Sequence, residues 1–191
     1  EMVKSLDPTK YEFAIRETKT REVISDAATM RSEIGILYLS DFNRKVLLKL
    51  LKANDLVFHK LIDCKPYVYL WKGHPLANER SISFSLYYAE EILAENEYPQ
   101  IIKANDRATM LNLMVGLNGY TLCSGIICEE LNGEEYRAVP FVSDSIAQST
   151  LMEIGYITRK NTTLSKVGRL YVEKISAYLG IPPQETEAYN I

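Results

Sequence analysis

Two stretches of the chain carry hydroxyl groups where a small anion or zwitterion could bind. Thr18 and Thr20 lie between a predicted strand and the start of a predicted helix. Tyr38 and Ser40 end a continuous apolar run at residues 34–39, and ligands of open α/β sheets bind at the carboxyl ends of strands. The alternative is structural, because threonine and serine also cap helices and a tyrosine can lie at the edge of a core.

A third candidate lies at the start of a helix predicted from Asp106. The Arg107 guanidinium could pair with a carboxylate or sulfate through two parallel hydrogen bonds. The hydroxyl of Thr109 and the N–H groups of the first helical turn could bind the same anion. A solvated arginine in a first turn is the simpler interpretation.

Catalysis and metal binding find little support in the sequence. The two histidines, His59 and His74, lie on a predicted strand and in a proline-containing loop, away from any nucleophile motif. Phosphate-binding glycine motifs and the zinc-protease pattern are absent. The 3 cysteines include no C-x-x-C pair, which disfavours zinc and disulfide frameworks and favours a reducing compartment. We expect no enzymatic activity, no metal and no cofactor.

The composition is that of an ordinary globular protein. Of the 191 residues, 47% are hydrophobic and 25% charged, which excludes disordered and collagen-like chains. The net charge of −3 disfavours a domain that binds nucleic acid through phosphates. Apolar runs are far shorter than the ~20 residues of a membrane helix, and the start at Glu1 suggests a fragment of a longer protein.

Helical and strand patterns alternate along the chain and predict an α/β fold with mostly parallel sheets. Helices are predicted at residues 20–27, 40 or 41 to 53, 85–96, 106–115 and 165–179. Strands are predicted at residues 11–17, 34–39, 56–61, 67–71, 100–104, 120–123, 136–141 and 151–158. The helix boundaries rest on N-caps and one glycine stop, which are Ser40 or Asp41, Ser85, Asp106, Ser165 and Gly180.

Four short segments, in a fixed order, carry a resemblance to a known family. They are Glu33-Ile34-Gly35-Ile36-Leu37; His74-Pro75-Leu76-Ala77 with Ile82-Ser83-Phe84; Asp106–Met114 with Gly119-Tyr120-Thr121-Leu122 and Val139-Pro140; and Ile157-Thr158-Arg159-Lys160 with Leu164-Ser165. In this order, from about Lys10 to Leu179, the chain resembles the effector-binding (regulatory) domain of a LysR-type transcriptional regulator.

The resemblance implies a type 2 periplasmic-binding-protein-like fold, in which two α/β lobes are joined by two crossing strands. Lobe one would comprise residues 1–68 and 156–191, and lobe two residues 72–152. DNA would be bound by an N-terminal winged helix-turn-helix that this chain lacks. A homodimer or tetramer would form through helices at residues 1–6 and 85–96.

The resemblance also implies an effector site in the cleft between the lobes. Relatives present a threonine or serine to the ligand near the positions of Thr18 and Thr20, and the region of Arg107 and Thr109 faces the cleft from lobe two. Cys64, near the first crossing strand, is a further candidate, with an inert buried thiol as the alternative. Four tyrosines near the predicted hinge could line an interface or a ligand, or form ordinary half-buried surface; they are Tyr67, Tyr69, Tyr87 and Tyr88.

The chain departs from the family in three places. The first strand and the first helical turns of the domain are missing before Glu1. Leu117-Asn118-Gly119 replaces the Gly-x-Gly of the second lobe. Phe84 runs directly into Ser85 where relatives have a loop, and we predict a chain break at that junction.

The sequence therefore predicts a cytoplasmic, ligand-sensing domain that controls transcription and has no membrane contact. The effector could be an amino acid, a sulfur metabolite or an aromatic acid. A free-standing solute-binding protein of the same fold is the first alternative. An enzyme on this fold, such as a periplasmic-binding-protein-like deaminase, is the second. The coding sequence upstream of Glu1 would separate a regulator from a secreted binding protein.

Overall fold

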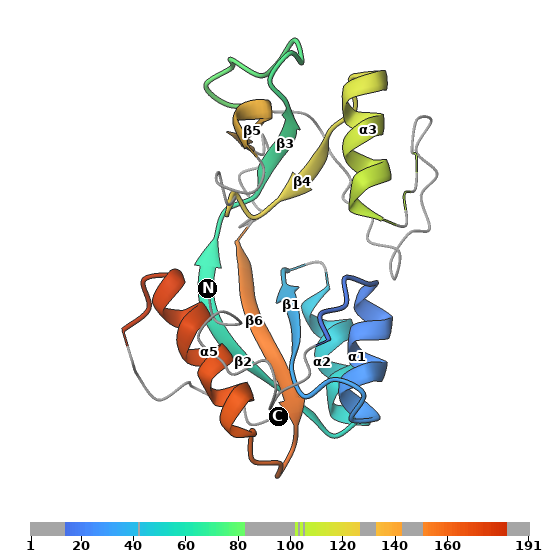
Figure 1. Ribbon diagram of the computed structural model, residues 1–191, viewed down its shortest axis with the longest axis vertical. Coiled ribbons are helices and arrows are strands. Elements are labelled where there is room, and N and C mark those ends of the chain that lie inside the picture. The colour runs from blue at the N-terminus through green and yellow to red at the C-terminus, as the bar shows by residue number, and fades with distance from the viewer. Residues whose placement is uncertain are drawn as a thin grey trace, which may run out of the picture. The chain divides into compact units, whose positions relative to one another are not determined.

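The computed structural model describes residues 14–41, 43–82, 102, 104, 106–126, 133–142 and 151–182. The chain divides into two compact units, which are described separately below (Figure 1). Unit 1 consists of residues 1–39, 44–62 and 153–191, and unit 2 of residues 40–43 and 63–152. The first lobe boundary expected from the sequence, at residues 68–72, lies later in the chain than the unit boundary after Ile62.

Unit 1 contains a three-stranded sheet in the order β1-β6-β2. The strands are β1 (Gly35–Leu39), β2 (Leu56–Cys64) and β6 (Met152–Arg159). Figure 1 shows α1 (Thr20–Ala28) and α2 (Arg44–Ala53) near β1, and α5 (Lys166–Tyr178) near β2. The spacing of apolar residues on α2 explains how this helix packs. Leu47 and Leu51 are one helical turn apart, and both are fully buried. At Gly35 a Cβ would lie 2.6 Å from Cγ1 of Val23, so glycine lets α1 approach β1.

Unit 2 contains a second three-stranded sheet, in the order β4-β3-β5, and one described α-helix. The elements are β3 (Tyr67–Trp71), α3 (Arg107–Leu117), β4 (Thr121–Cys123), the 3-10 turn η2 (Gly133–Glu135) and β5 (Tyr136–Pro140). Successive side chains of a strand point to opposite faces. Val68 and Leu70 therefore share one face of β3, where they join a hydrophobic cluster with Ala77, Ile82 and Val139. The other face carries Tyr67, Tyr69 and Trp71.

The strand pairs β1–β6, β3–β4 and β3–β5 are antiparallel. The prediction of mostly parallel sheets is wrong for these three pairs. In unit 1 the reason is connectivity: the chain leaves the unit along β2 and returns to it along β6. The returning strand β6 lies between β1 and β2 in the sheet and runs antiparallel to β1, with Gly35 opposite Ile157 and Leu39 opposite Glu153.

Most of the helix boundaries predicted from capping residues are confirmed. The Asp106 carboxylate accepts a hydrogen bond from the Thr109 N–H at 2.8 Å and begins α3. The Ser165 hydroxyl accepts one from the Gly168 N–H at 3.0 Å and begins α5. Beyond the end of α5, Gly180 has a φ of 70°, the left-handed conformation that glycine adopts without strain.

The predicted start of α2 is wrong, because α2 begins at Arg44 rather than after Ser40 or Asp41. The Asn43 side-chain carbonyl accepts a hydrogen bond from the Ser40 N–H at 2.8 Å. The Asn43 N–H also donates to the Ser40 carbonyl at 3.2 Å. These two bonds close a turn between Ser40 and Asn43, so the helix begins only at Arg44.

Two predicted strands are wrong in their described parts. Residues 14–19 are irregular rather than extended in a sheet, and Ile15 is 86% exposed, so the alternation there buries no apolar face. Ile102 and Ala104, the described part of the predicted strand at 100–104, also lie outside any strand. The predicted helices at residues 1–6 and 85–96, and the Phe84–Ser85 junction, lie outside the described residues.

Candidate functional site

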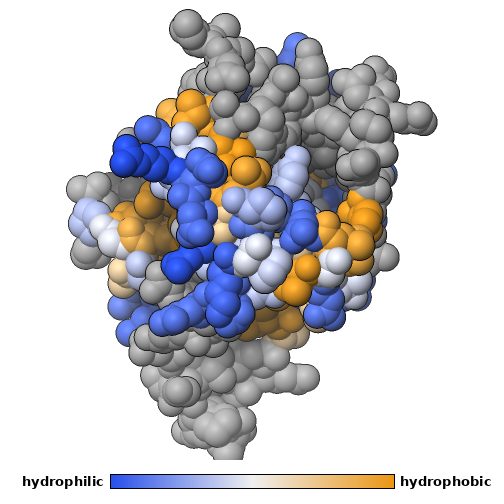
Figure 2. Space-filling model, turned by 90° about the horizontal axis from the view of Figure 1, so that it is seen from above, coloured by the Kyte–Doolittle hydropathy of each residue, from blue (hydrophilic) through white to orange (hydrophobic). Residues whose placement is uncertain are grey.

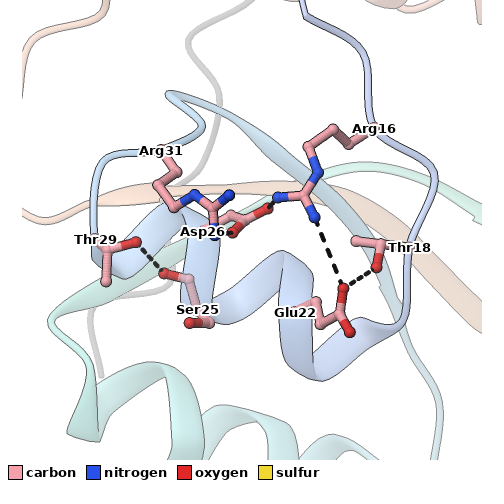
Figure 3. A network of polar contacts seen from close by, with 7 residues as sticks. All are labelled: Arg16, Thr18, Glu22, Ser25, Asp26, Thr29 and Arg31. Carbon is pink, nitrogen blue, oxygen red and sulfur yellow. Dashed lines mark hydrogen bonds and ion pairs between the residues drawn. The ribbon is translucent and has the colours of Figure 1, made fainter.

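A network of polar contacts holds residues 16–18 against α1 (Figure 3). Arg16 forms an ion pair and hydrogen bond with Asp26, which is only 5% exposed. Arg31 reaches the other carboxylate oxygen of Asp26 at 3.6 Å. Glu22 accepts a hydrogen bond from the Thr18 hydroxyl and lies 3.9 Å from the Arg16 guanidinium. The network fixes the turn that contains two predicted ligand-binding threonines.

Helix capping does not account for Thr18 and Thr20. The N-cap of α1 is Lys19, whose side chain makes no capping bond. Thr18 is half-buried and uses its hydroxyl as a donor to Glu22, and Thr20 is the half-buried first residue of the helix. The Thr18 hydroxyl oxygen keeps its acceptor capacity, so a ligand with an N–H or O–H group could still bind there.

The carboxyl end of β1 carries a buried hydroxyl that lacks a partner. Ser40 is 8% exposed, and its Oγ makes no hydrogen bond in the described part of the chain. Tyr38, two residues earlier, is half-buried on the strand. Buried polar groups are nearly always paired, so the Ser40 hydroxyl marks a position where an added donor or acceptor would be stabilising.

Charged groups lie close to this end of the strand. Glu153 pairs with Leu39 across β1 and β6. Its carboxylate lies 2.5 Å from the Arg44 guanidinium and 4.0 Å from the Lys60 ammonium. Within unit 1 the carboxylate is thus held between two cations.

At the start of α3, both polar groups of Thr109 bond the carboxylate of the N-cap residue Asp106. The Thr109 N–H and hydroxyl are the main groups that lower the pKa of Asp106, because both hydrogen-bond its carboxylate. Thr109 therefore serves the helix cap. Arg107 remains the group at this helix start that could recognise an anion.

Tyr69 lies on β3 and interacts with Arg107. It is 4% exposed, and its ring stacks on Tyr136 with centroids 5.4 Å apart. The Arg107 guanidinium acts on its hydroxyl both by its charge and by a side-chain hydrogen bond. Burial raises the pKa of Tyr69, and the nearby Arg107 guanidinium opposes that rise. The sequence groups Tyr69 with three other tyrosines, but only the structure shows that its hydroxyl is buried beside a cation.

Cys64 ends β2 and its thiol lies 3.5 Å from the Met152 carbonyl oxygen, to which it donates. Burial first, and then the nearby Asp63 and Cys123, raise the pKa of the Cys64 thiol. Burial also raises the pKa of Cys123. Both groups therefore favour the protonated thiol, which is the less reactive form.

The segment His74-Pro75-Leu76-Ala77 is hydrogen-bonded to the C-terminal end of α3. His74 Nδ1 accepts from the Leu76 N–H at 3.1 Å, so Nε2 carries the proton and donates to the Asn118 carbonyl at 3.0 Å. Trp71 Nε1 donates to the Asn118 side-chain oxygen at 3.0 Å. Asn118 has a φ of 50° at the C-cap of α3, the left-handed conformation in which asparagine often ends a helix.

The described surface has no sign of a metal centre or a membrane span. Histidine, cysteine and acidic side chains do not gather in threes there, and each described helix is too short or too polar to cross a bilayer. Hydrophobic and hydrophilic patches lie side by side on the face shown in Figure 2. In unit 2 the exposed apolar side chains include Val115, Leu117 and Tyr120.

Comparison with known proteins identifies the fold. The sequence matches no family model and no curated protein. The reduced form of OxyR superimposes with a TM-score of 0.56 at 16% identity, over 90% of this chain and 82% of that one. HinK, a LysR family regulator from Pseudomonas aeruginosa, gives 0.54 at 18% identity, over 88% and 60%. The effector-binding domain of QuiR in complex with shikimate gives 0.55 at 16% identity, over 87% and 80%.

The chain has the type 2 periplasmic-binding-protein-like fold. More particularly, it folds as the effector-binding domains of LysR-family regulators do, so the fold that the sequence resemblance implies is confirmed. The chain spans 60% of the HinK polypeptide.

Proposed function

We propose that the chain is the ligand-sensing domain of a LysR-type transcriptional regulator and acts in the cytoplasm without catalysis. Its fold is shared with regulators of that family, and one neighbour of the same fold was solved with shikimate bound. A small molecule would bind between the two lobes, taken as residues 1–68 with 156–191 and residues 72–152. DNA would be contacted by a winged helix-turn-helix outside this chain.

The observation that carries this proposal is the unpaired hydroxyl of Ser40 at the carboxyl end of β1. Ligands of open α/β sheets bind at such strand ends, and this buried group has donor and acceptor capacity left. Thr18, Thr20, Tyr38 and Cys64 would contribute from neighbouring positions, and Arg107 and Thr109 from the second lobe.

Binding should shift the balance between two arrangements of a homodimer or tetramer. A ligand does this only if its affinity differs between the two arrangements. The effector would be an amino acid, a sulfur metabolite or an aromatic acid, classes that hydroxyls and one guanidinium can hold.

Calorimetric titration with representatives of these three classes tests the proposal. We expect one compound to bind saturably with one site per chain. Ser40→Ala should weaken it roughly ten- to a hundredfold if the hydroxyl bonds a charged group, and Thr18→Ala or Thr20→Ala should weaken it less. The matched control is Thr163→Ala, an exposed hydroxyl between β6 and α5. Equal affinities for Ser40→Ala and the parent chain would place the site elsewhere.

A free-standing solute-binding protein has the same fold and would pass the same titration. The coding sequence upstream of Glu1 separates the two. A helix-turn-helix there supports the regulator, and a secretion signal supports the binding protein.

A further inference from the structure

The turn that carries Ser40 is anchored on both sides to a single residue, Glu153. Leu39, the last residue of β1, pairs with Glu153 across β1 and β6. Arg44, the first residue of α2, places its guanidinium 2.5 Å from the Glu153 carboxylate. The turn closed by Ser40 and Asn43 lies between these two contacts in the chain. Backbone pairing therefore holds one side of the turn, and an ion pair to the same residue holds the other.

The position of the Ser40 hydroxyl depends on this turn. Its Oγ makes no hydrogen bond in the part of the chain that the structure describes. The backbone of Ser40 is held instead, because its N–H donates to the Asn43 side-chain carbonyl at 2.8 Å and its own carbonyl accepts the Asn43 N–H at 3.2 Å. A binding group must be held within about 0.5 Å of its productive position. A shift of the turn would therefore move the hydroxyl out of register with a ligand.

The surroundings of Glu153 make it a firm anchor. It lies on β6, the middle strand of the sheet β1-β6-β2, and its side chain is only 17% exposed. Salt weakens an ion pair that is shielded from water less than it weakens a surface pair. Lys60, on β2, lies 4.0 Å from the same carboxylate, but Arg44 is the cation that directly follows the turn.

We propose that Glu153 is a positioning residue for effector binding, which acts through Arg44 and the turn to hold the Ser40 hydroxyl in place. The inference rests on the proposed function, because that function makes the Ser40 hydroxyl a ligand contact. It adds that an ion pair outside the ligand contacts sets the affinity for the effector.

Hydrogen exchange of the Ser40 N–H, followed by NMR on the whole chain without ligand, is the first test. Glu153→Gln keeps the side-chain length and the backbone pairing with Leu39 but removes the charge. The Ser40 N–H should then exchange about fivefold faster, the factor that corresponds to the loss of a favourable ion pair. Arg44→Gln should have the same effect, and Arg44→Lys, which keeps a cation, should restore most of the protection.

Lys60→Gln is the matched control. Like Arg44→Gln, it removes one positive charge beside the Glu153 carboxylate, but Lys60 lies on β2 and not next to the turn. The Ser40 N–H should exchange in Lys60→Gln at the rate of the parent chain. Equal acceleration in Lys60→Gln and Arg44→Gln would show that the cluster only stabilises the unit, and would overturn the proposal.

Calorimetry with a panel of L-methionine, thiosulfate and phenylacetate, one compound from each proposed class, extends the test to binding. Glu153→Gln should weaken the compound that binds about fivefold, and Lys60→Gln should leave its affinity unchanged. In a Ser40→Ala background, Glu153→Gln should weaken binding no further, because no hydroxyl remains to be positioned.

Three results would overturn the proposal: unchanged Ser40 exchange in Glu153→Gln, unchanged affinity in that variant, or additive losses from Ser40→Ala and Glu153→Gln. The proposed function can fail separately. If none of the three compounds binds while Ser40 exchange responds as described, the sensing role fails and the anchoring of the turn by Glu153 stands.

Discussion

At the scale of single residues, the structure separates hydroxyls that are already used from hydroxyls that are free to bind. Thr18 donates to Glu22 and Thr109 bonds Asp106, whereas Ser40 is buried and its hydroxyl makes no hydrogen bond in the described residues. Residue type and spacing predict the candidates. They cannot predict which hydroxyl is satisfied, because that depends on side chains brought together by folding.

His59 makes a prediction about pH. Its Nε2 lies 2.8 Å from the buried Thr158 hydroxyl and its ring stacks on Tyr156, with centroids 4.6 Å apart. Burial lowers the pKa of His59 below its ordinary value of 6.5. Below pH 6.5 the imidazole takes up a proton in the unfolded chain but not in the folded chain. The free energy of unfolding therefore decreases as the pH is lowered, until the pH reaches the pKa of His59 in the folded chain.

Urea unfolding at about pH 7.5 and about pH 5 checks this, since the interval spans the ordinary titration of histidine. The parent chain should lose more stability over the interval than His59→Gln, which has no imidazole to protonate. Carboxylates contribute to both proteins alike. An identical loss in the two proteins would refute the role assigned to His59.

At the scale of elements, apolar spacing and capping residues predict most helices and strands. Leu47 and Leu51 place α2, and Asp106 and Ser165 begin α3 and α5. The errors lie where contacts between residues far apart in the sequence determine the structure. Strand direction depends on how the chain leaves and re-enters unit 1. Residues 14–17 have the alternating pattern of a strand, but they are irregular in the structure, where Arg16 is bound to α1.

The start of α5 is the element whose stability can be tested most simply. Ser165 caps the helix, and Glu33 accepts hydrogen bonds from both the N–H and the hydroxyl of Ser165, the latter at 2.8 Å. Ser165→Ala removes the cap and one bond to a carboxylate. It should cost about 1–2 kcal/mol in the free energy of unfolding.

Chemical denaturation of Ser165→Ala beside Thr163→Ala measures that loss. Thr163 lies two residues earlier and is exposed, so its variant should stay within about 0.5 kcal/mol of the parent chain. Equal stability of the two variants would show that the cap contributes nothing.

At the scale of the whole molecule, the central claim is the proposal that one small ligand binds residues of both units. The sequence resemblance predicts this, and the comparisons show that the chain has the fold of an effector-binding domain. The candidate residues lie on both units, with Thr18, Thr20 and Tyr38 in unit 1 and Ser40, Cys64, Arg107 and Thr109 in unit 2. The sequence predicts Ser40 in lobe one, next to the helix that follows it. The structure assigns Ser40 to unit 2, and the turn closed by Asn43, which the sequence does not reveal, separates it from α2.

Hydrogen exchange followed by mass spectrometry, with and without the tightest-binding compound of the panel, tests this claim most directly. The account predicts slower exchange at residues 17–20 of unit 1 and, at the same ligand concentration, at residues 40–43 and 106–109 of unit 2. The exposed stretch at residues 161–163 should exchange at an unchanged rate and serves as the internal control. Protection confined to one unit, or spread evenly over the chain, would contradict a ligand shared by the two.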